Sequence, residues 1–280
     1  MKDFKDKVAV ITGGNSGIGY GIARAFASEG AKLYLVGMDE QKAIDAAKRL
    51  TEDFGVEAVG VSCDVTSRAA VEAMADDAYA RFGTVDILVN NAGVGYGGEV
   101  HVIGESDWDW VMTVNVKGVF QCCAVFVPRF LEQGTRAHIA NMGSEQCFGL
   151  ADPQFGSMVV YNTSKHALLG FSDSLRRDLA PQGISVSLIC PGPVATDIWN
   201  AQRSRQDEFG GAVESDIANA EAIKEMGMHP DLVGRITVAG MKNDDFYILT
   251  HDYIRDMITE RYEETMSAAD NTDKWLKEFS

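Results

Sequence analysis

Thr12-Gly13-Gly14-Asn15-Ser16-Gly17-Ile18-Gly19 follows a short β-rich run at residues 8–12 and opens a helical pattern at 17–29. Glycines at such a turn let the backbone bend tightly and approach a pyrophosphate, which the positive end of the following helix attracts. Counted from Gly13, the spacing is G-x-x-x-G-x-G rather than G-x-G-x-x-G. A glycine-rich turn can also be purely structural, so its place between a strand and a helix carries much of the argument.

The turn is part of a regular alternation of strand and helix patterns. Strands are expected at 8–12, 32–36, 58–62, 87–90, 138–142, 185–189 and 246–249, and helices at 17–29, 40–54, 68–81, 108–131, 159–179, 230–241 and 253–266. Strands that are apolar at nearly every position and separated by helices indicate a parallel sheet covered on both faces. The sequence therefore predicts a doubly wound α/β fold with ligands beyond the carboxyl ends of the strands.

Two stretches depart from this alternation. Residues 196–230 are polar and charged, and we interpret them as a mobile substrate lid, with a plain surface insertion as the alternative. Residues 230–280 are expected to form a helix, a strand and a helix that extend the same domain. We therefore expect a single domain over residues 1–280.

Composition limits the classes of function. The chain is 46% hydrophobic and 24% charged, as in soluble globular proteins, and its net charge of −16 disfavours nucleic-acid and anionic-membrane surfaces. It shows no signal-peptide pattern and no apolar run near the ~20 residues that span a bilayer, so we expect a cytoplasmic protein without membrane partners. The five cysteines are irregularly spaced and are expected to be buried free thiols, and the histidines show no metal-ligand spacing.

Tyr161-Asn162-Thr163-Ser164-Lys165 spells Y-x-x-x-K. A phenol alone is a poor base, because its unperturbed pKa is near 10. A lysine four residues later in a helix lies on the same face and can hold the phenol near its anionic form. The pair therefore suggests proton transfer to or from an alcohol oxygen.

In combination, these motifs resemble the short-chain dehydrogenase/reductase family. The resemblance covers about residues 5–198 and rests on the T-G-x-x-x-G-I-G turn, on Asn90-Asn91-Ala92-Gly93 and on Y-x-x-x-K. Further matches are Asp64, Asn115, Ser144 and Pro191-Gly192, each in the expected order along the chain. The resemblance implies a Rossmann-type fold, NAD(P)-dependent chemistry on CH-OH groups, and a homo-oligomer (a dimer or tetramer) assembled through the helix of Tyr161 and its neighbour.

The resemblance also implies which residues hold the dinucleotide. The glycines of the turn would hold the pyrophosphate, Asp64 and Val65 would meet the adenine, and Val194 and Thr196 would meet the carboxamide. The full set that it implies is Gly13, Asn15, Ser16, Gly17, Ile18, Gly19, Met38, Asp39, Asp64, Val65, Asn91, Ala92, Gly93, Tyr161, Lys165, Pro191, Gly192, Val194 and Thr196.

The choice between NAD and NADP depends on the end of the second strand. NAD-preferring relatives usually carry an acidic residue there, and NADP-preferring relatives often carry Gly-Arg, whereas this chain has Gly37 and Met38. A 2′-phosphate would find no arginine in these motifs, where Asp39 and Glu40 would repel it, while Lys42 and Arg24 remain possible partners outside any motif. The sequence therefore favours NAD over NADP.

By resemblance, the catalytic residues are Asn115, Ser144, Tyr161 and Lys165. Tyr161 would be the acid/base, with its pKa lowered by Lys165. Ser144 would bind the substrate oxygen, and Asn115 would bind a water that links Lys165 to solvent.

The substrate-contacting residues are expected to be Ser144, Gln146, Phe148, Tyr161 and Trp199, and their surroundings are largely apolar. Such a lining favours a bulky, largely apolar secondary alcohol or ketone. Sixteen residues separate Ser144 from Tyr161, more than is common in the family, and we expect the longer loop to reshape the pocket.

Two alternatives stay open. One is a 3-oxoacyl reductase acting on acyl-carrier-protein or CoA substrates, which the lack of an arginine cluster disfavours. The other is a dinucleotide-sensing regulator, which would usually have lost the Tyr or the Lys. Residues 243–251 are also similar to the carboxyl region of bacterial Cα-dehydrogenases that act on aryl alcohols such as lignin dimers.

Overall fold

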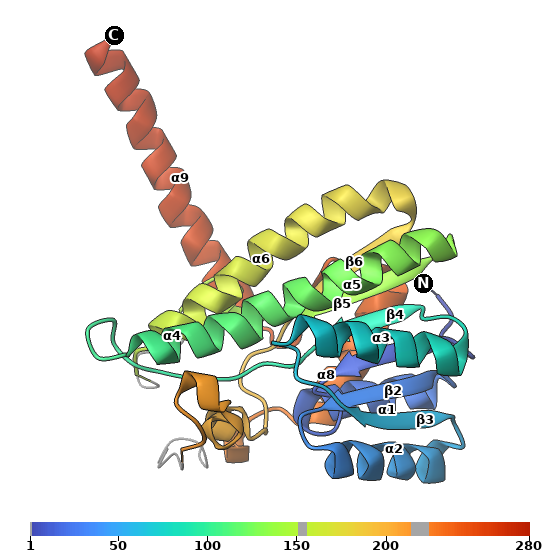
Figure 1. Ribbon diagram of the computed structural model, residues 1–280. Helices are drawn as coiled ribbons and strands as arrows, with labels where there is room; N and C mark the ends of the chain where they lie inside the picture. Colours follow the sequence, from blue (N-terminus) through green and yellow to red (C-terminus); the bar gives the residue numbers. More distant parts are fainter. Residues whose placement is uncertain (1, 151–155, 214–223) are drawn as a thin grey trace.

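One parallel sheet with strand order β3-β2-β1-β4-β5-β6-β7 organises the molecule (Figure 1). The computed structural model describes residues 2–150, 156–213 and 224–280. The strands are β1 Val8–Thr12, β2 Lys32–Gly37, β3 Ala58–Ser62, β4 Ile87–Asn90, β5 Ala137–Met142, β6 Ile184–Cys190 and β7 Tyr247–Leu249. The predicted doubly wound α/β fold is confirmed, and the bounds of all seven strands agree with the prediction to within one residue at either end.

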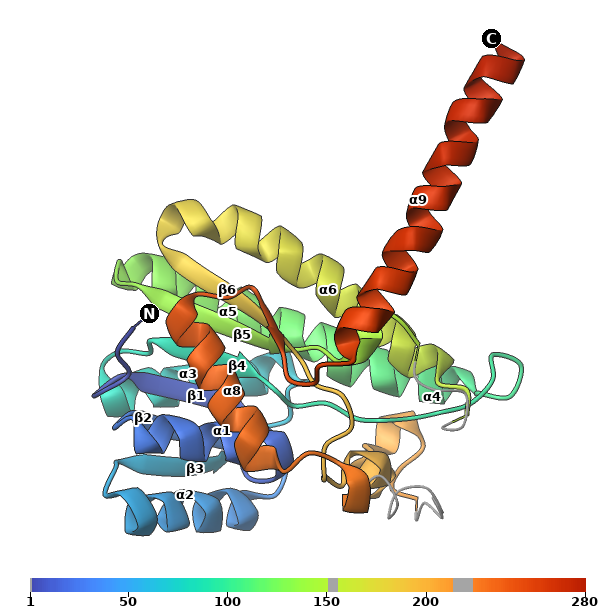
Figure 2. The ribbon, with the colours of Figure 1, turned by 180° about the vertical axis from the view of Figure 1, so that it is seen from behind.

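Helices cover both faces of the sheet. They are α1 Gly17–Ser28, α2 Glu40–Phe54, α3 Arg68–Phe82, α4 Glu105–Met112, α5 Gly118–Gln133, α6 Val159–Leu179, α8 Pro230–Asn243 and α9 Ile254–Phe279. Helices α3, α5 and α6 cover the face seen in Figure 1, and α1, α2 and α8 cover the opposite face, seen in Figure 2. Each face of the sheet forms a hydrophobic core with its helices, and successive side chains of β1 point to opposite faces. Val10 packs in the core with α3, α5 and α6, and Ile11 packs in the core with α1, α2 and α8.

A π-helical turn interrupts the helix predicted at 108–131. The turn, Thr113–Lys117, joins α4 to α5 and contains Asn115. Such turns insert an extra residue into a helix and occur often at functional sites, and hydrophobic periodicity does not reveal them. The combined run Glu105–Gln133 contains an 18-residue window that is apolar enough to cross a membrane, with a mean hydropathy of 1.5, but 61% of that window is buried inside the protein.

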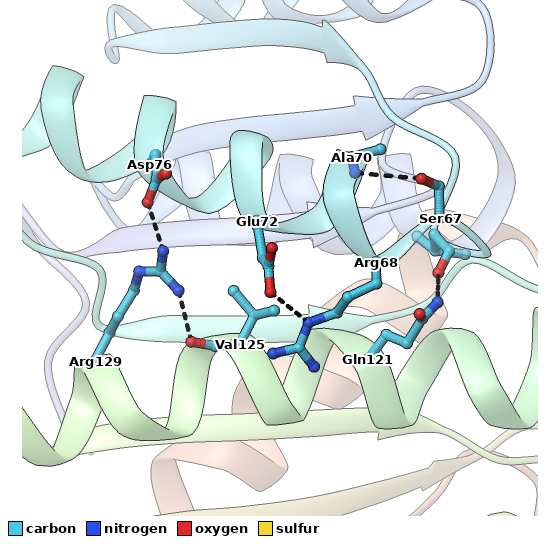
Figure 3. A network of polar contacts seen from close by, with 9 residues as sticks. Ser67, Arg68, Ala70, Glu72, Asp76, Gln121, Val125 and Arg129 are labelled. Atoms are coloured by element: carbon cyan, nitrogen blue, oxygen red, sulfur yellow. Dashed lines mark hydrogen bonds and ion pairs between the residues drawn. The ribbon is translucent and has the colours of Figure 1, made fainter.

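Polar contacts fix α5 against α3 and against the end of β3 (Figure 3). The guanidinium of Arg129 pairs with Asp76 on α3, and its second nitrogen donates to the carbonyl of Val125 at 2.8 Å. Buried Gln121 donates from Nε2 to the carbonyl of Val65 at 2.7 Å. The backbone at Val65, where the adenine is expected, is therefore tied to α5.

The carboxyl-terminal helix is longer than predicted. Periodicity suggested 253–266, whereas α9 continues to Phe279 and projects away from the body in both overall views (Figures 1 and 2). Only its first residue, Ile254, is buried. Its first turn packs closely on the body, because Met257 lies against Gly149. A Cβ on Gly149 would lie only 2.8 Å from Cε of Met257.

The lid and the loop before Tyr161 are described in part. Residues 214–223 of the predicted lid and 151–155 of the loop lie outside the described residues. The described part of the lid contains the short 3-10 turns η5 Ile198–Ser204 and η6 Asp207–Phe209. All five cysteines are buried and free, as predicted.

Candidate active site

A pocket of about 480 Å³ lies beyond the carboxyl ends of strands β1 to β6 and is covered in part by the lid. Its wall contains most of the predicted site residues: Gly13, Asn15, Ser16, Gly17, Ile18, Met38, Asp39, Asp64, Val65, Asn91, Ala92, Gly93, Ser144, Gln146, Tyr161, Lys165, Pro191, Gly192, Val194, Thr196 and Trp199. Gly19, Asn115 and Phe148 are not part of this wall.

The glycine turn has the shape that a pyrophosphate needs. Gly13 and Gly17 have φ angles of 61° and 52°, in the left-handed region that favours glycine. Ser16 is the N-cap of α1, and its side chain makes no capping bond to the described backbone, so the first amides of α1 are left for an anion. Gly19 has another role, because a Cβ there would lie 2.2 Å from the carbonyl oxygen of Gly13. It allows close packing of α1 on the turn and does not line the pocket.

The turn is fixed to the segment after β4. The hydroxyl of Thr12 accepts from the amides of Asn91 and Ala92, both at 3.0 Å. The side-chain amide of Asn91 donates to the carbonyls of Thr12 and Gly13 at 2.9 and 3.1 Å. These bonds hold two expected cofactor segments in one rigid unit.

At the end of β3, a lid residue already contacts Asp64. One carboxylate oxygen of Asp64 accepts from the amide of Thr66 at 2.9 Å, and the other accepts from Nε2 of Gln206 at 3.0 Å. Gln206 also accepts from the indole of fully buried Trp110 at 3.1 Å. Sequence reasoning missed Gln206, because no local pattern relates it to a residue 142 positions earlier.

The end of β2 combines an acidic residue with a lysine. Asp39 caps α2 by accepting from the amide of Lys42, and it pairs with the Lys42 ammonium, both at 3.1 Å. The backbone hydrogen bond from Lys42 is the main cause that lowers the pKa of Asp39. Lys42 lines the pocket, but Asp39 already neutralises its charge.

Helix α6 brings Tyr161 and Lys165 together on one face. The Lys165 ammonium lies 5.4 Å from the centre of the Tyr161 ring and donates to the carbonyl of Met142 at 2.9 Å. Burial lowers the pKa of Lys165 to about 8. Burial also raises the pKa of Tyr161, and a hydrogen bond with Ser144 opposes that rise. The expectation that Lys165 lowers the pKa of Tyr161 stays a prediction.

Ser144 begins the 3-10 turn η2, Glu145–Cys147, and its hydroxyl accepts from the amide of Gln146 at 3.2 Å. The next residue, Glu145, is a buried carboxyl group in the pocket wall that sequence reasoning missed. It accepts a hydrogen bond from the hydroxyl of Tyr253. Burial raises the pKa of Glu145, and the bond from Tyr253 opposes that rise.

Asn115 lies beneath the wall, where it joins the β4 loop to α6. Its side chain accepts from the amide of Val94 at 2.8 Å and donates to the Val94 carbonyl at 3.0 Å. It also donates to the hydroxyl of Ser164 at 3.1 Å, and that hydroxyl donates to the carbonyl of Tyr161 at 2.7 Å. The predicted water-binding role of Asn115 stays a prediction.

The predicted substrate residues divide into two groups. Gln146 and Trp199 line the pocket, and the Trp199 ring lies 5.6 Å from the Tyr161 ring between centres. Phe148 instead stacks edge-on against Tyr247 of β7, with 5.5 Å between ring centres. The structure therefore places Phe148 behind the wall.

A buried ion pair fixes the lid to α4. Arg205 pairs with Asp107 at 2.6 Å, and its guanidinium lies 5.1 Å from the ring centre of Trp110. The Arg205 and Asp107 side chains are 6% and 15% exposed. This pair attaches Arg205 of the lid to the body of the protein, and the mobility of the lid stays a prediction.

Known proteins resemble this chain along nearly its whole length. The family model of the short chain dehydrogenases matches residues 7–207. A C alpha-dehydrogenase of a Sphingobium species is 32% identical over 271 residues, which cover 94% of this chain and 86% of that protein. A short-chain dehydrogenase/reductase from Burkholderia phymatum, solved in complex with NAD, has a TM-score of 0.88 and 36% identity, covering 96% of this chain and 97% of that one. A short-chain dehydrogenase from Sphingobium yanoikuyae, solved with NADPH, has a TM-score of 0.72 and 26% identity over 93% and 95% of the two chains.

Proposed function

This chain belongs to the short-chain dehydrogenase/reductase family, and on that premise we propose that it transfers a hydride between a nicotinamide dinucleotide and a bulky, largely apolar secondary alcohol or ketone. The observation that carries the proposal is one pocket wall that contains Ser144, Tyr161 and Lys165 together with the glycine turn. The left-handed glycines and the open start of α1 fit a dinucleotide pyrophosphate. When bound, the nicotinamide ring supplies the hydride donor or acceptor.

In this proposal Tyr161 moves the proton of the alcohol oxygen. Burial raises its pKa, so formation of the phenolate needs a nearby positive charge. Lys165, with a pKa of about 8, is mostly protonated at neutral pH and supplies that charge from one helical turn away. The hydroxyl of Ser144, which lines the same pocket wall as Tyr161, orients the substrate oxygen.

We propose NAD as the preferred dinucleotide. Lys42 is the cation in the pocket wall at the end of β2, and its pairing with Asp39 at 3.1 Å supports this preference. A 2′-phosphate would have to compete with the Asp39 carboxylate for Lys42. Relatives of known structure bind either dinucleotide, so the preference needs a direct measurement.

The similarity to a C alpha-dehydrogenase suggests secondary alcohols next to an aromatic ring as the first substrates to test. Trp199, close to Tyr161, gives such a ring a stacking partner. Binding of NAD and NADP should be measured by titration, and turnover by NADH or NADPH absorbance with a panel of aryl secondary alcohols and their ketones.

The decisive comparison is wild type against Tyr161→Phe. Loss of the hydroxyl removes the proton-transfer group but leaves the pocket shape, so dinucleotide binding should change by less than about threefold, while turnover falls about 10²–10⁴-fold. Tyr262→Phe, at an exposed position of α9, is the control and should behave as wild type. Equal turnover in wild type and Tyr161→Phe would rule out the proposed chemistry.

A further inference from the structure

The segment after β7 packs against the part of the site where the nicotinamide is expected. Tyr253 donates its hydroxyl to Oε2 of Glu145, and the backbone amide of Glu145 donates to the carbonyl of Pro191 at 2.8 Å. A Cβ on Gly192 would lie 2.1 Å from the Tyr253 hydroxyl and 2.8 Å from Oε2 of Glu145. The Pro191-Gly192 turn therefore has no room to shift toward these side chains.

His251 holds the same turn from a second direction. The amide of Gly192 donates to Nδ1 of His251 at 3.0 Å, and the hydroxyl of Thr250 lies 2.8 Å from that nitrogen. An acceptor at Nδ1 requires a neutral ring with its proton on Nε2. Burial is the main cause that lowers the pKa of His251, which favours the neutral form. The His251 ring also contacts Tyr253 edge-on, with 5.6 Å between centres.

Glu145 connects these contacts to the catalytic side. It is 8% exposed, lies in the pocket wall and directly follows Ser144 in the chain. Its backbone is fixed through Pro191 and its side chain through Tyr253. Without Tyr253, the carboxyl group would lose a donor inside the protein, and the turn would lose the group that fills the space above Gly192.

We propose that Glu145, His251 and Tyr253 are positioning residues, which hold the Pro191-Gly192 turn in register with Ser144 and thereby place the nicotinamide against Tyr161. The inference rests on the proposed function, because it assigns the turn to nicotinamide binding. It gives the carboxyl-terminal segment a role in the reaction that neither its sequence nor its distance from Tyr161 along the chain indicates.

The test compares Tyr253→Phe with Glu145→Gln in the full chain. Hydrogen–deuterium exchange of the ligand-free protein reports on the Gly192 amide, and exchange of a peptide covering 190–196 should become at least about tenfold faster in Tyr253→Phe. With dinucleotide and substrate, kcat should fall about tenfold, while the dinucleotide Kd changes less than about threefold, because misplacement affects hydride transfer more than binding at the pyrophosphate. Glu145→Gln keeps an acceptor for Tyr253, so it should change both the exchange and kcat less than Tyr253→Phe does.

Tyr262→Phe controls for the loss of a hydroxyl from the same part of the chain. Unchanged exchange at 190–196 in Tyr253→Phe would overturn the inference, as would faster exchange with an unchanged kcat. An equal loss of kcat in Glu145→Gln and Tyr253→Phe would also contradict it, because the loss would then not depend on the hydrogen bond from Tyr253 to residue 145. If wild type turns over no alcohol but exchange at 190–196 is still faster in Tyr253→Phe than in wild type, the proposed function fails while the contacts still fix the turn.

Discussion

Lys165 is a buried cation whose protonation links the site to folding stability. The folded protein loses the Lys165 proton at a pKa of about 8, whereas the ordinary value is 10.5. Between these pH values the unfolded chain binds more protons, so the free energy of unfolding rises with pH across that window. The difference of about two and a half pKa units corresponds to about 3 kcal/mol of stability that is absent at pH 7.

Replacing Lys165 by Met should remove this pH dependence. Relative to wild type, the unfolding free energy of Lys165→Met should fall by about 3 kcal/mol between pH 7 and pH 10.5, because wild type gains stability there and the variant does not. The Met142 carbonyl loses its donor in the variant at every pH, so this cost does not alter the slope. Urea unfolding at a series of pH values measures the difference, and a difference that is constant with pH would contradict the buried charge.

Sequence reasoning reached those residues whose partners are close in the chain. Tyr161 and Lys165 are four positions apart in a helix, and the glycine turn follows its strand directly. Gln206 and Tyr253 were missed, because they reach Asp64 and Glu145 across 142 and 108 residues, and such contacts depend on how the elements pack. Phe148 was assigned to the substrate from its place after Ser144, but β7 supplies Tyr247 as a stacking partner behind the wall.

Among the elements, α1 and α8 cross through two glycines. A Cβ on Gly234 of α8 would lie 2.1 Å from the carbonyl oxygen of Gly21, and a Cβ on Gly21 of α1 would lie 2.3 Å from the carbonyl oxygen of Pro230. Both obstacles are backbone atoms, so neither can rotate away. Gly234→Ala should therefore lower the free energy of unfolding by about 1–3 kcal/mol, measured by urea denaturation.

Gly170 is the matched control. It also lies within a helix, but a Cβ there meets no atom within 4 Å among the described residues. Gly170→Ala should raise the free energy of unfolding by about 0.5–1 kcal/mol, because alanine has the higher helix propensity. Equal effects of the two substitutions would mean that the α1–α8 contact does not limit their approach.

Element bounds were predictable where one periodicity dominates. The bounds of α2, β3 and α6 agree with the pattern, since apolar spacing changes sharply at their ends. The π-helical turn at Thr113–Lys117 was not foreseen, because one extra residue barely changes the apolar spacing. The end of α9 was placed too early, at residue 266, whereas the helix continues to Phe279 with apolar and polar side chains alike exposed.

Over the whole molecule, the negative charge is concentrated outside the pocket. The pocket wall contains four acidic residues, Asp39, Asp64, Glu145 and Asp197, and four basic residues, Lys42, Lys165, Arg203 and Lys224. The chain as a whole carries a formal charge of −16. The excess of carboxylates therefore lies on the rest of the protein, where mutual repulsion destabilises the compact state.

Salt should relieve this repulsion with little effect on dinucleotide binding. Raising NaCl from about 0.01 M to about 0.15 M shortens the Debye length from about 30 Å to about 8 Å. The Tm of the ligand-free protein should rise by about 2–4 °C, which corresponds to about 1 kcal/mol for a chain of this size. The Kd for NAD should change less than about threefold, because the pocket wall is balanced in charge and only exposed groups are screened strongly. Differential scanning calorimetry and titration measure the two quantities, and KCl should reproduce the NaCl result if screening is the cause. A Tm that is constant or falls with salt would show that the surplus carboxylates do not limit stability.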